Sequence, residues 1–175
     1  DRPLRDYLPA DFSDSEANSL LIGTNDVISG STALGNDLGD SIVTFARNAE
    51  TDGGAVTINA DGQIQVTNIE TGGTTTEGVA DAANAGNVAL TSTNQGINIG
   101  TAGNAGNGSI DAQGANTTTA ATTGGTGGTV SLITSNALVA STYNDITVTD
   151  INTNGGASTT AAGGGAGAIT ITSNA

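Results

Sequence analysis

One short pattern of apolar and polar positions recurs four times along the chain. Each copy is a glycine, a spacer, and two aliphatic residues at alternate positions, the alternation expected of a β-strand with one buried face. The copies are Gly54-Ala-Val56-Thr-Ile58, Gly86-Asn-Val88-Ala-Leu90, Gly128-Thr-Val130-Ser-Leu132 and Gly167-Ala-Ile169-Thr-Ile171. Counted from Val56 to Val88, Val130 and Ile169, they return after 32, 42 and 39 residues. Such recurrence is typical of chains that stack repeats on one another.

Two further strand patterns follow within each unit. In the first unit they are Ile64-Gln-Val66 and Ile69-Glu-Thr71, closed by Gly72-Gly73. The order returns in Ile146-Thr-Val148, Ile151-Asn-Thr153 and Gly155-Gly156, and in the middle unit as Ile97-Asn-Ile99 and Ser109-Ile110, separated by an insertion from Gly100 to Gly108. The pattern therefore predicts about three short strands per unit, and each unit is one coil of an all-β solenoid.

The repeat boundaries predict how the chain is organised. Residues 1–18 form an N-terminal arm or cap, 19–52 an imperfect first coil, and 53–175 the repeats. The repeats divide into 53–85, 86–127, 128–166 and an incomplete 167–175. All three Arg, both Pro and three of the four aromatic residues lie in the first 52 residues, so the composition changes where the array begins.

Three stretches between the strand patterns contain little but Thr, Ala, Gly and Asn: Thr74–Ala85, Ala115–Gly127 and Ala157–Gly165. We expect them to be excursions from one corner of the solenoid, where insertions are tolerated because the cost of loop closure grows slowly with length. A binding or glycosylation surface is the functional alternative, and a tolerated spacer is favoured over it.

Composition supports a solenoid over an ordinary globular domain. The chain has 27 Gly, two Tyr, two Phe and no Trp or Met, too few large side chains for one central core. A solenoid interior needs only a few Val, Ile and Leu from each coil. Disorder is the alternative for a Gly- and Thr-rich chain, but alternation that recurs in register disfavours it.

Charge and missing residue types narrow the function. A net charge of −14 with no Lys argues against nucleic-acid partners and anionic membranes, and no apolar run is long enough for a membrane span. No Cys, His, Lys or Trp is present, and no Arg follows Arg47, so the groups that a catalytic or sugar-binding site needs are missing. We predict that the protein is not an enzyme and has no cofactor. Asp37 and Asp40 form a weak Ca²⁺ candidate beside the simpler interpretation of a polar turn.

The unit Gly-Gly-x-Val-x-Ile-x-x-x-Gly-x-Ile-x-Val-x-x-Ile-x-Thr-x-Gly-Gly, from Gly53 to Gly73, resembles the repeats of filamentous haemagglutinin-type exoproteins, especially large cyanobacterial ones. The resemblance covers about Gly53 to Ala175. It implies a right-handed parallel β-helix, export to the cell surface of a bacterium, and a role in adhesion or in an extracellular fibre. It brings no catalytic residues, and the handedness rests on it alone.

The last unit breaks off after its first strand, which would leave an open coil if Ala175 is the true end. We then expect subunits to stack head to tail, the N-terminal arm of one chain covering Ile169 and Ile171 of its neighbour by strand addition. The arm would bury Leu4, Tyr7, Leu8 and Phe12. A boundary cut through a longer array is the equally weighted alternative.

The predicted function is a non-catalytic, secreted structural protein, the subunit of an extracellular homopolymeric filament. The main alternative is the stalk of a large surface adhesin, with cell-surface or glycan ligands. A carbohydrate-active β-helix enzyme and an ice-binding solenoid are less favoured. Against ice binding, Thr147-Val-Thr149 and Thr170-Ile-Thr172 are not matched in the other units, where Thr57/Asn59, Ala89/Thr91 and Ser131/Ile133 stand instead.

Overall fold

A computed structural model describes residues 20–21, 41–44, 52–73, 82–100, 108–135 and 145–174. These residues form strands and extended segments and contain no helix, so none of them forms an apolar helix that could cross a membrane. The strands are β1 (Leu20–Leu21), β2 (Ser41–Val43), β3 (Val56–Ala60), β4 (Ile64–Val66), β5 (Asn68–Glu70), β6 (Val88–Ser92), β7 (Ile97–Ile99), β8 (Ser109–Asp111), β9 (Val130–Ser135), β10 (Ile146–Thr147), β11 (Asp150–Asn152) and β12 (Ile169–Asn174).

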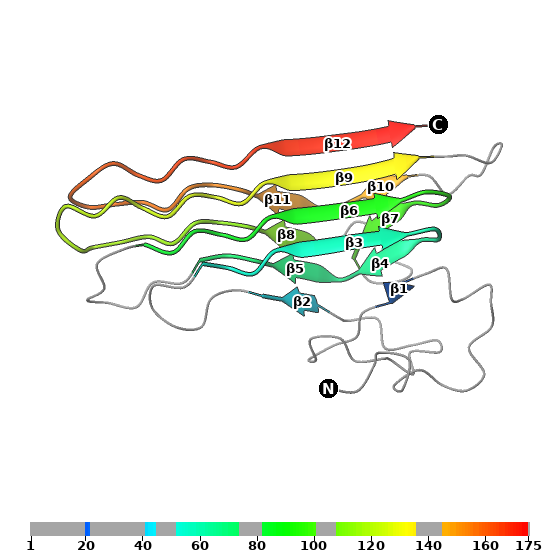
Figure 1. The fold of residues 1–175 in the computed structure, drawn as a ribbon, viewed down its shortest axis with the longest axis horizontal. Coiled ribbons are helices and arrows are strands. Elements are labelled where there is room, and N and C mark those ends of the chain that lie inside the picture. The colour runs from blue at the N-terminus through cyan, green and yellow to red at the C-terminus, as the bar shows by residue number, and fades with distance from the viewer. Residues whose placement is uncertain are drawn as a thin grey trace.

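The strands pair in parallel to form three sheets of four strands each (Figure 1). Sheet A has the order β1-β4-β7-β10, sheet B the order β11-β8-β5-β2, and sheet C the order β12-β9-β6-β3. The chain visits the three sheets in the same cyclic order from β1 to β12. The architecture is therefore all-β, of the parallel β-helix or solenoid class, and together the sheets make what we call the three-sheet body.

Sheet C carries the recurring phrase in register. Val56 pairs with Val88, Val88 with Val130, and Val130 with Ile169, so the four copies lie directly above one another. Ile58, Leu90, Leu132 and Ile171 form the second column. Because successive side chains of a strand point to opposite faces, one choice of register buries both columns. The equivalence predicted for the four phrases is confirmed.

Sheets A and B complete the apolar interior. Ile64, Ile97 and Ile146 stack in sheet A, and Ile42, Ile69, Ile110 and Ile151 stack in sheet B. Of these, Ile64, Ile97, Ile69 and Ile110 are fully buried in the core cluster. The two further strand patterns predicted for each unit are confirmed as β4 and β5, β7 and β8, and β10 and β11.

Polar side chains stack on the outside of sheet A. Gln65, Asn98 and Thr147 are register partners on β4, β7 and β10. Asn98 Nδ2 donates to Gln65 Oε1 at 2.7 Å, and Thr147 Oγ1 donates to Asn98 Oδ1 at 2.8 Å. Hydrogen bonds between equivalent positions of successive strands stabilise the sheet along the stacking direction.

The Gly/Thr/Ala-rich stretches extend from the edge between sheets B and C (Figure 1). We call their described residues the glycine arm. They comprise outgoing legs that follow sheet B (71–73, 112–118 and 153–159) and return legs that lead into sheet C (82–87, 122–129 and 160–168). The interpretation of these stretches as spacers leaves out their order. The legs stack on one another through backbone hydrogen bonds.

The return leg before β9 shows the pattern of these bonds. Gly124 and Gly127 donate their N–H groups to the carbonyls of Ala162 and Gly165 in the neighbouring return leg, at 3.1 and 2.9 Å. Gly125 donates to Ala115 O of the outgoing leg at 2.9 Å. The direction of the N–H group therefore changes from one residue to the next and recurs at every third residue. An extended helix with three residues per turn has the same periodicity.

The remaining third of these N–H groups is satisfied by asparagine side chains. Thr126 N donates to Asn84 Oδ1 and Thr129 N donates to Asn87 Oδ1, each at 2.8 Å. Asn84 and Asn87 belong to the preceding return leg. The glycine arm is thus an ordered, hydrogen-bonded stack whose described legs contain no Val, Ile or Leu.

Candidate assembly edge

The edge of sheet C at β12 exposes the two aliphatic columns that are buried elsewhere. Ile169 and Ile171 are 47% and 51% exposed, whereas their register partners Val130 and Leu132 are 1% and 0% exposed. The side chains are chemically alike, so the difference in exposure arises because β12 has a described neighbour on one side only. Of the predicted assembly residues, the structure places these two at an open strand edge.

Three more aliphatic residues continue this surface across the other sheets. Ile146, Val148 and Ile151 follow the columns of sheets A and B and pack against the core while remaining partly exposed. The edge strands β10 and β11 carry or flank these residues. We define the assembly edge as Ile146, Val148, Ile151, Ile169 and Ile171. The sequence pattern predicts only the last two, because the place of the other three depends on which strands end sheets A and B.

Beside the assembly edge, the last return leg of the glycine arm presents backbone groups. Gly127 and Gly165 occupy successive return legs and are joined by the N–H of Gly127 and the carbonyl of Gly165. A Cβ added at Gly127 would lie 1.9 Å from Thr153 O, whereas one added at Gly165 would have nothing within 4 Å. A Cβ therefore has no room beside the outgoing leg at Gly127 and has ample room at Gly165.

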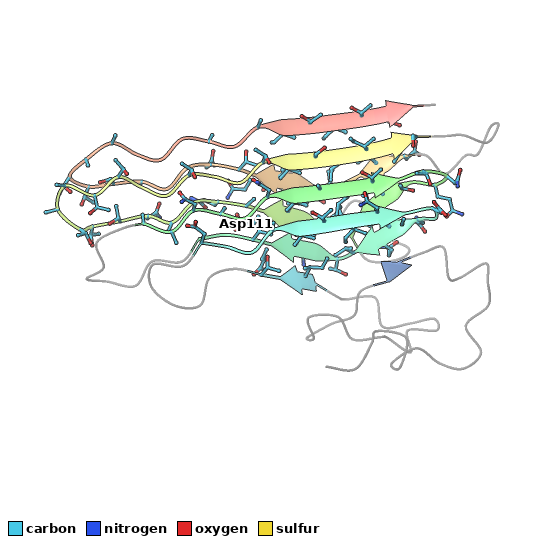
Figure 2. The ribbon with its side chains drawn as sticks, viewed as in Figure 1. Asp111 is labelled. Carbon is cyan, nitrogen blue, oxygen red and sulfur yellow. The ribbon has the colours of Figure 1, made fainter. Side chains whose placement is uncertain are left out.

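The acidic side chains of the described residues lie away from this edge or point outward. Asp111 is at the end of β8, where that strand passes into the glycine arm (Figure 2). Its Oδ1 accepts from Asn152 Nδ2 at 3.1 Å and from Gln113 N at 3.2 Å. Asp145 and Asp150 are exposed beside β10 and at the start of β11. Their surroundings agree with a solvated face.

Among the described residues, no three His, Cys, Asp or Glu side chains are grouped as a metal site requires. The Ca²⁺ candidates Asp37 and Asp40 lie outside these residues, as do Leu4, Tyr7, Leu8 and Phe12 of the predicted N-terminal arm.

A polar groove of about 380 Å³ lies on the return legs. It is lined by Asp52, Ala82, Ala83, Asn84, Thr123, Gly124 and Thr126. Asn84 is already engaged there, since its N–H donates to Asp52 Oδ1 at 2.8 Å and its Oδ1 accepts from Thr126. Among its described lining residues are one carboxylate, that of Asp52, and no cationic or aromatic side chain.

No family model, curated protein or solved structure matches the chain. The function must therefore be argued from the residues and the geometry of this molecule.

Proposed function

We propose that the protein is a non-catalytic structural rod that works outside the cell, as a subunit of a head-to-tail β-solenoid filament. The observation that carries the proposal is the unbroken register of the columns that end in the half-exposed Ile169 and Ile171. The column positions are buried in the earlier strands and exposed on β12, so one more strand of the same kind would cover them.

The finer architecture belongs to this proposal. The solenoid has about three strands per coil. It is right-handed, because a parallel strand–crossover–strand connection is right-handed in nearly all proteins. Each added coil extends the parallel ladders and the apolar column by about 4.8 Å. The rod therefore lengthens without changing its cross-section.

Strand addition at the assembly edge has a clear energetic basis. A neighbouring strand would cover two half-exposed isoleucines, and full burial of such a side chain stabilises by about 1.5–3 kcal/mol relative to exposure. It would also accept and donate backbone hydrogen bonds along β12, as β9 does on the other side. In the filament the occupant is a second copy of the chain, and its residues Leu4, Tyr7, Leu8 and Phe12 supply the covering arm.

Electron microscopy combined with two variants tests the filament. We expect the unaltered chain to form fibres of uniform width, and Ile169→Asp/Ile171→Asp to abolish them, because a carboxylate would have to be buried at the subunit junction. Thr170→Asp is the matched control, since Thr170 lies between the two isoleucines on the opposite face of β12. Deletion of residues 1–18 should also abolish the fibres, and fibres that persist without them would exclude the N-terminal arm as the covering strand.

A second function uses the same edge. In the stalk of a larger surface adhesin, the occupant of the assembly edge is a further coil of the same polypeptide. The continuous columns favour this form equally, because they specify the kind of strand that follows and leave open which molecule provides it. The mass of the native protein recovered from its source separates the two: a chain of about the present length supports a filament, and a much longer one supports a stalk.

A further inference from the structure

Charge is distributed unevenly over the described surface. The described residues contain six carboxylates, Asp52, Asp61, Glu70, Asp111, Asp145 and Asp150, and no Lys or Arg. Glu70, Asp111 and Asp150 lie on sheet B, Asp145 directly precedes β10 of sheet A, and Asp61 directly follows β3 of sheet C. Sheet C has no charged residue in any of its four strands.

The return legs extend this uncharged region beyond sheet C. They run directly into its strands and keep the same stacking order (Figure 1). Ala85 N donates to Thr126 O, Val88 N to Thr129 O, and Val130 N to Ala168 O, at 2.8 to 2.9 Å. We call the outward surface of residues 53–60, 82–92, 122–135 and 160–174 the uncharged face; Asp52 and Asp61 stand at the two ends of its first row.

Short side chains line this face in two outward columns on sheet C. Thr57, Ala89, Ser131 and Thr170 form one column, and Asn59, Thr91, Ile133 and Thr172 form the other. Most of these side chains carry a hydroxyl or a methyl group, Asn59 carries a carboxamide, and Ile133 contributes the largest apolar group. A second surface of the same kind could approach closely, because no long or charged side chain stands between the two.

The size of the uncharged face matches that of a specific interface. With about 4.8 Å between rows and about 3.3 Å per strand residue, and about 3.1 Å per residue in the legs, the face covers roughly 700 Å². Pairing two such faces would bury on the order of 1,400 Å², which falls within the roughly 1,200–2,000 Å² of stable complexes.

We propose that the uncharged face is a lateral docking surface for the same face of a second copy of this chain. The net charge of −14 makes two copies repel each other, and pairing through sheet B would bring the carboxylates of Glu70, Asp111 and Asp150 toward those of the second copy. The described residues of the uncharged face carry no charge, so two rods can meet through them without burying one. This pairing runs side by side, so it is independent of elongation at the assembly edge.

Sedimentation equilibrium of the full chain at about 0.01 M and about 1 M salt tests the pairing, because the Debye length falls between these conditions from about 30 Å to about 3 Å. We expect tighter pairing at high salt, where repulsion between the acidic rods is screened. Ile133→Asp should weaken pairing by at least about tenfold, since it places a carboxylate within the contact.

Two controls separate lateral pairing from other effects. Asn154→Asp adds the same charge on an exposed outgoing leg, outside the uncharged face, and should leave pairing within about twofold, as expected for a charge away from the contact. Ile171→Asp should block elongation and leave pairing intact, and electron micrographs should then show particles that are doubled in width. Circular dichroism establishes that each variant keeps its β-structure.

Three results would overturn the proposal. They are a monomer at every protein and salt concentration, equal weakening by Ile133→Asp and Asn154→Asp, and particles that grow in length alone. A monomer whose uncharged face instead adsorbs to a neutral polysaccharide or to ice would also overturn it. Loss of fibres with retained pairing would count against the filament and leave the lateral contact standing.

Discussion

The three-sheet body and the glycine arm are parts of the same stack and are stabilised in different ways. In the body, each strand places Val, Ile or Leu into shared columns, and side chains such as Leu90, Ile97 and Leu132 are completely buried. In the arm, legs without Val, Ile or Leu lie side by side, and their N–H groups bind carbonyls in successive directions. Burial of apolar area dominates in the first region and backbone hydrogen bonding in the second.

The difference explains the residue types of each region. A column of aliphatic side chains keeps neighbouring sheets apart by about 10 Å, the usual spacing of packed sheets. Legs that bond to one another through their backbones must approach much more closely, and glycine permits this approach because it lacks a Cβ. The same chain therefore changes from Val- and Ile-rich to Gly-rich as it passes from body to arm.

The largest effect is expected in the body. Leu132→Ala removes a fully buried side chain from the middle of a column and should cost about 3 to 5 kcal/mol in the free energy of unfolding, through lost burial and the cavity left behind. Ser131→Ala, whose side chain faces outward from the same strand, should change it by less than about 0.5 kcal/mol. Urea denaturation followed by circular dichroism measures both, and equal losses would contradict an aliphatic core.

A matched glycine pair tests the close approach in the arm. Gly127→Ala would place a Cβ 1.9 Å from Thr153 O and should cost about 1 to 3 kcal/mol or more, because backbone has to move. Gly165→Ala has nothing within 4 Å and should be neutral or stabilising by up to about 1 kcal/mol. The two substitutions are identical in chemistry, so the difference in melting temperature isolates the contact; similar melting temperatures would argue that the legs are not tightly stacked.

The junction between body and arm rests on a buried threonine. Thr71 Oγ1 donates to Gly86 O at 2.8 Å, and Thr153 makes the same bond to Gly167 O at 3.0 Å. Thr71→Val keeps the shape and loses this bond, at a cost of about 1 kcal/mol. Hydrogen exchange should speed up at the Gly86 amide, which donates to Thr71 O, while the amides of β9 are unaffected. Faster exchange spread evenly over the body would mean that the arm and body open together.

The smallest effect concerns a single exposed asparagine. Asn87→Ala removes the side-chain acceptor of Thr129 N and should cost about 0.5 kcal/mol, near the lower limit for one hydrogen bond. Exchange of the Thr129 amide should then accelerate by about two- to threefold. The neighbouring Val130 amide, which donates to Ala168 O, serves as the internal reference. An unchanged Thr129 amide would show that water replaces Asn87 without loss.

The body could be predicted from the sequence and the arm could not. Alternating apolar residues identify Val56–Ile58 or Val130–Leu132 as half-buried strands, and their spacing identifies the stacking partners. In the arm, the feature that repeats is the direction of the backbone N–H groups. The hydropathy of the side chains carries no information about that direction. The signal that could have revealed it is the three-residue spacing of Thr123-Gly-Gly-Thr-Gly-Gly-Thr129, in which each position of the triplet serves one bonding direction.

The candidate surfaces show the same division. Ile169 and Ile171 could be named from the sequence because they repeat a phrase that is buried elsewhere. The contributions of Ile146, Val148 and Ile151 to the assembly edge depend on which strands end each sheet, and this is a property of the topology. The uncharged face likewise combines four segments that are far apart in the sequence.

By itself, the sequence determined the parallel strands and the columns that stack, because a two-residue alternation leaves one register in which every aliphatic side chain is buried. Only the tertiary structure decided that the described glycine-rich stretches form an ordered arm and that the uncharged described residues of sheet C and the return legs share one face. Those features depend on backbone groups and strands from successive layers meeting in space, and the alternation of apolar and polar side chains does not specify such meetings.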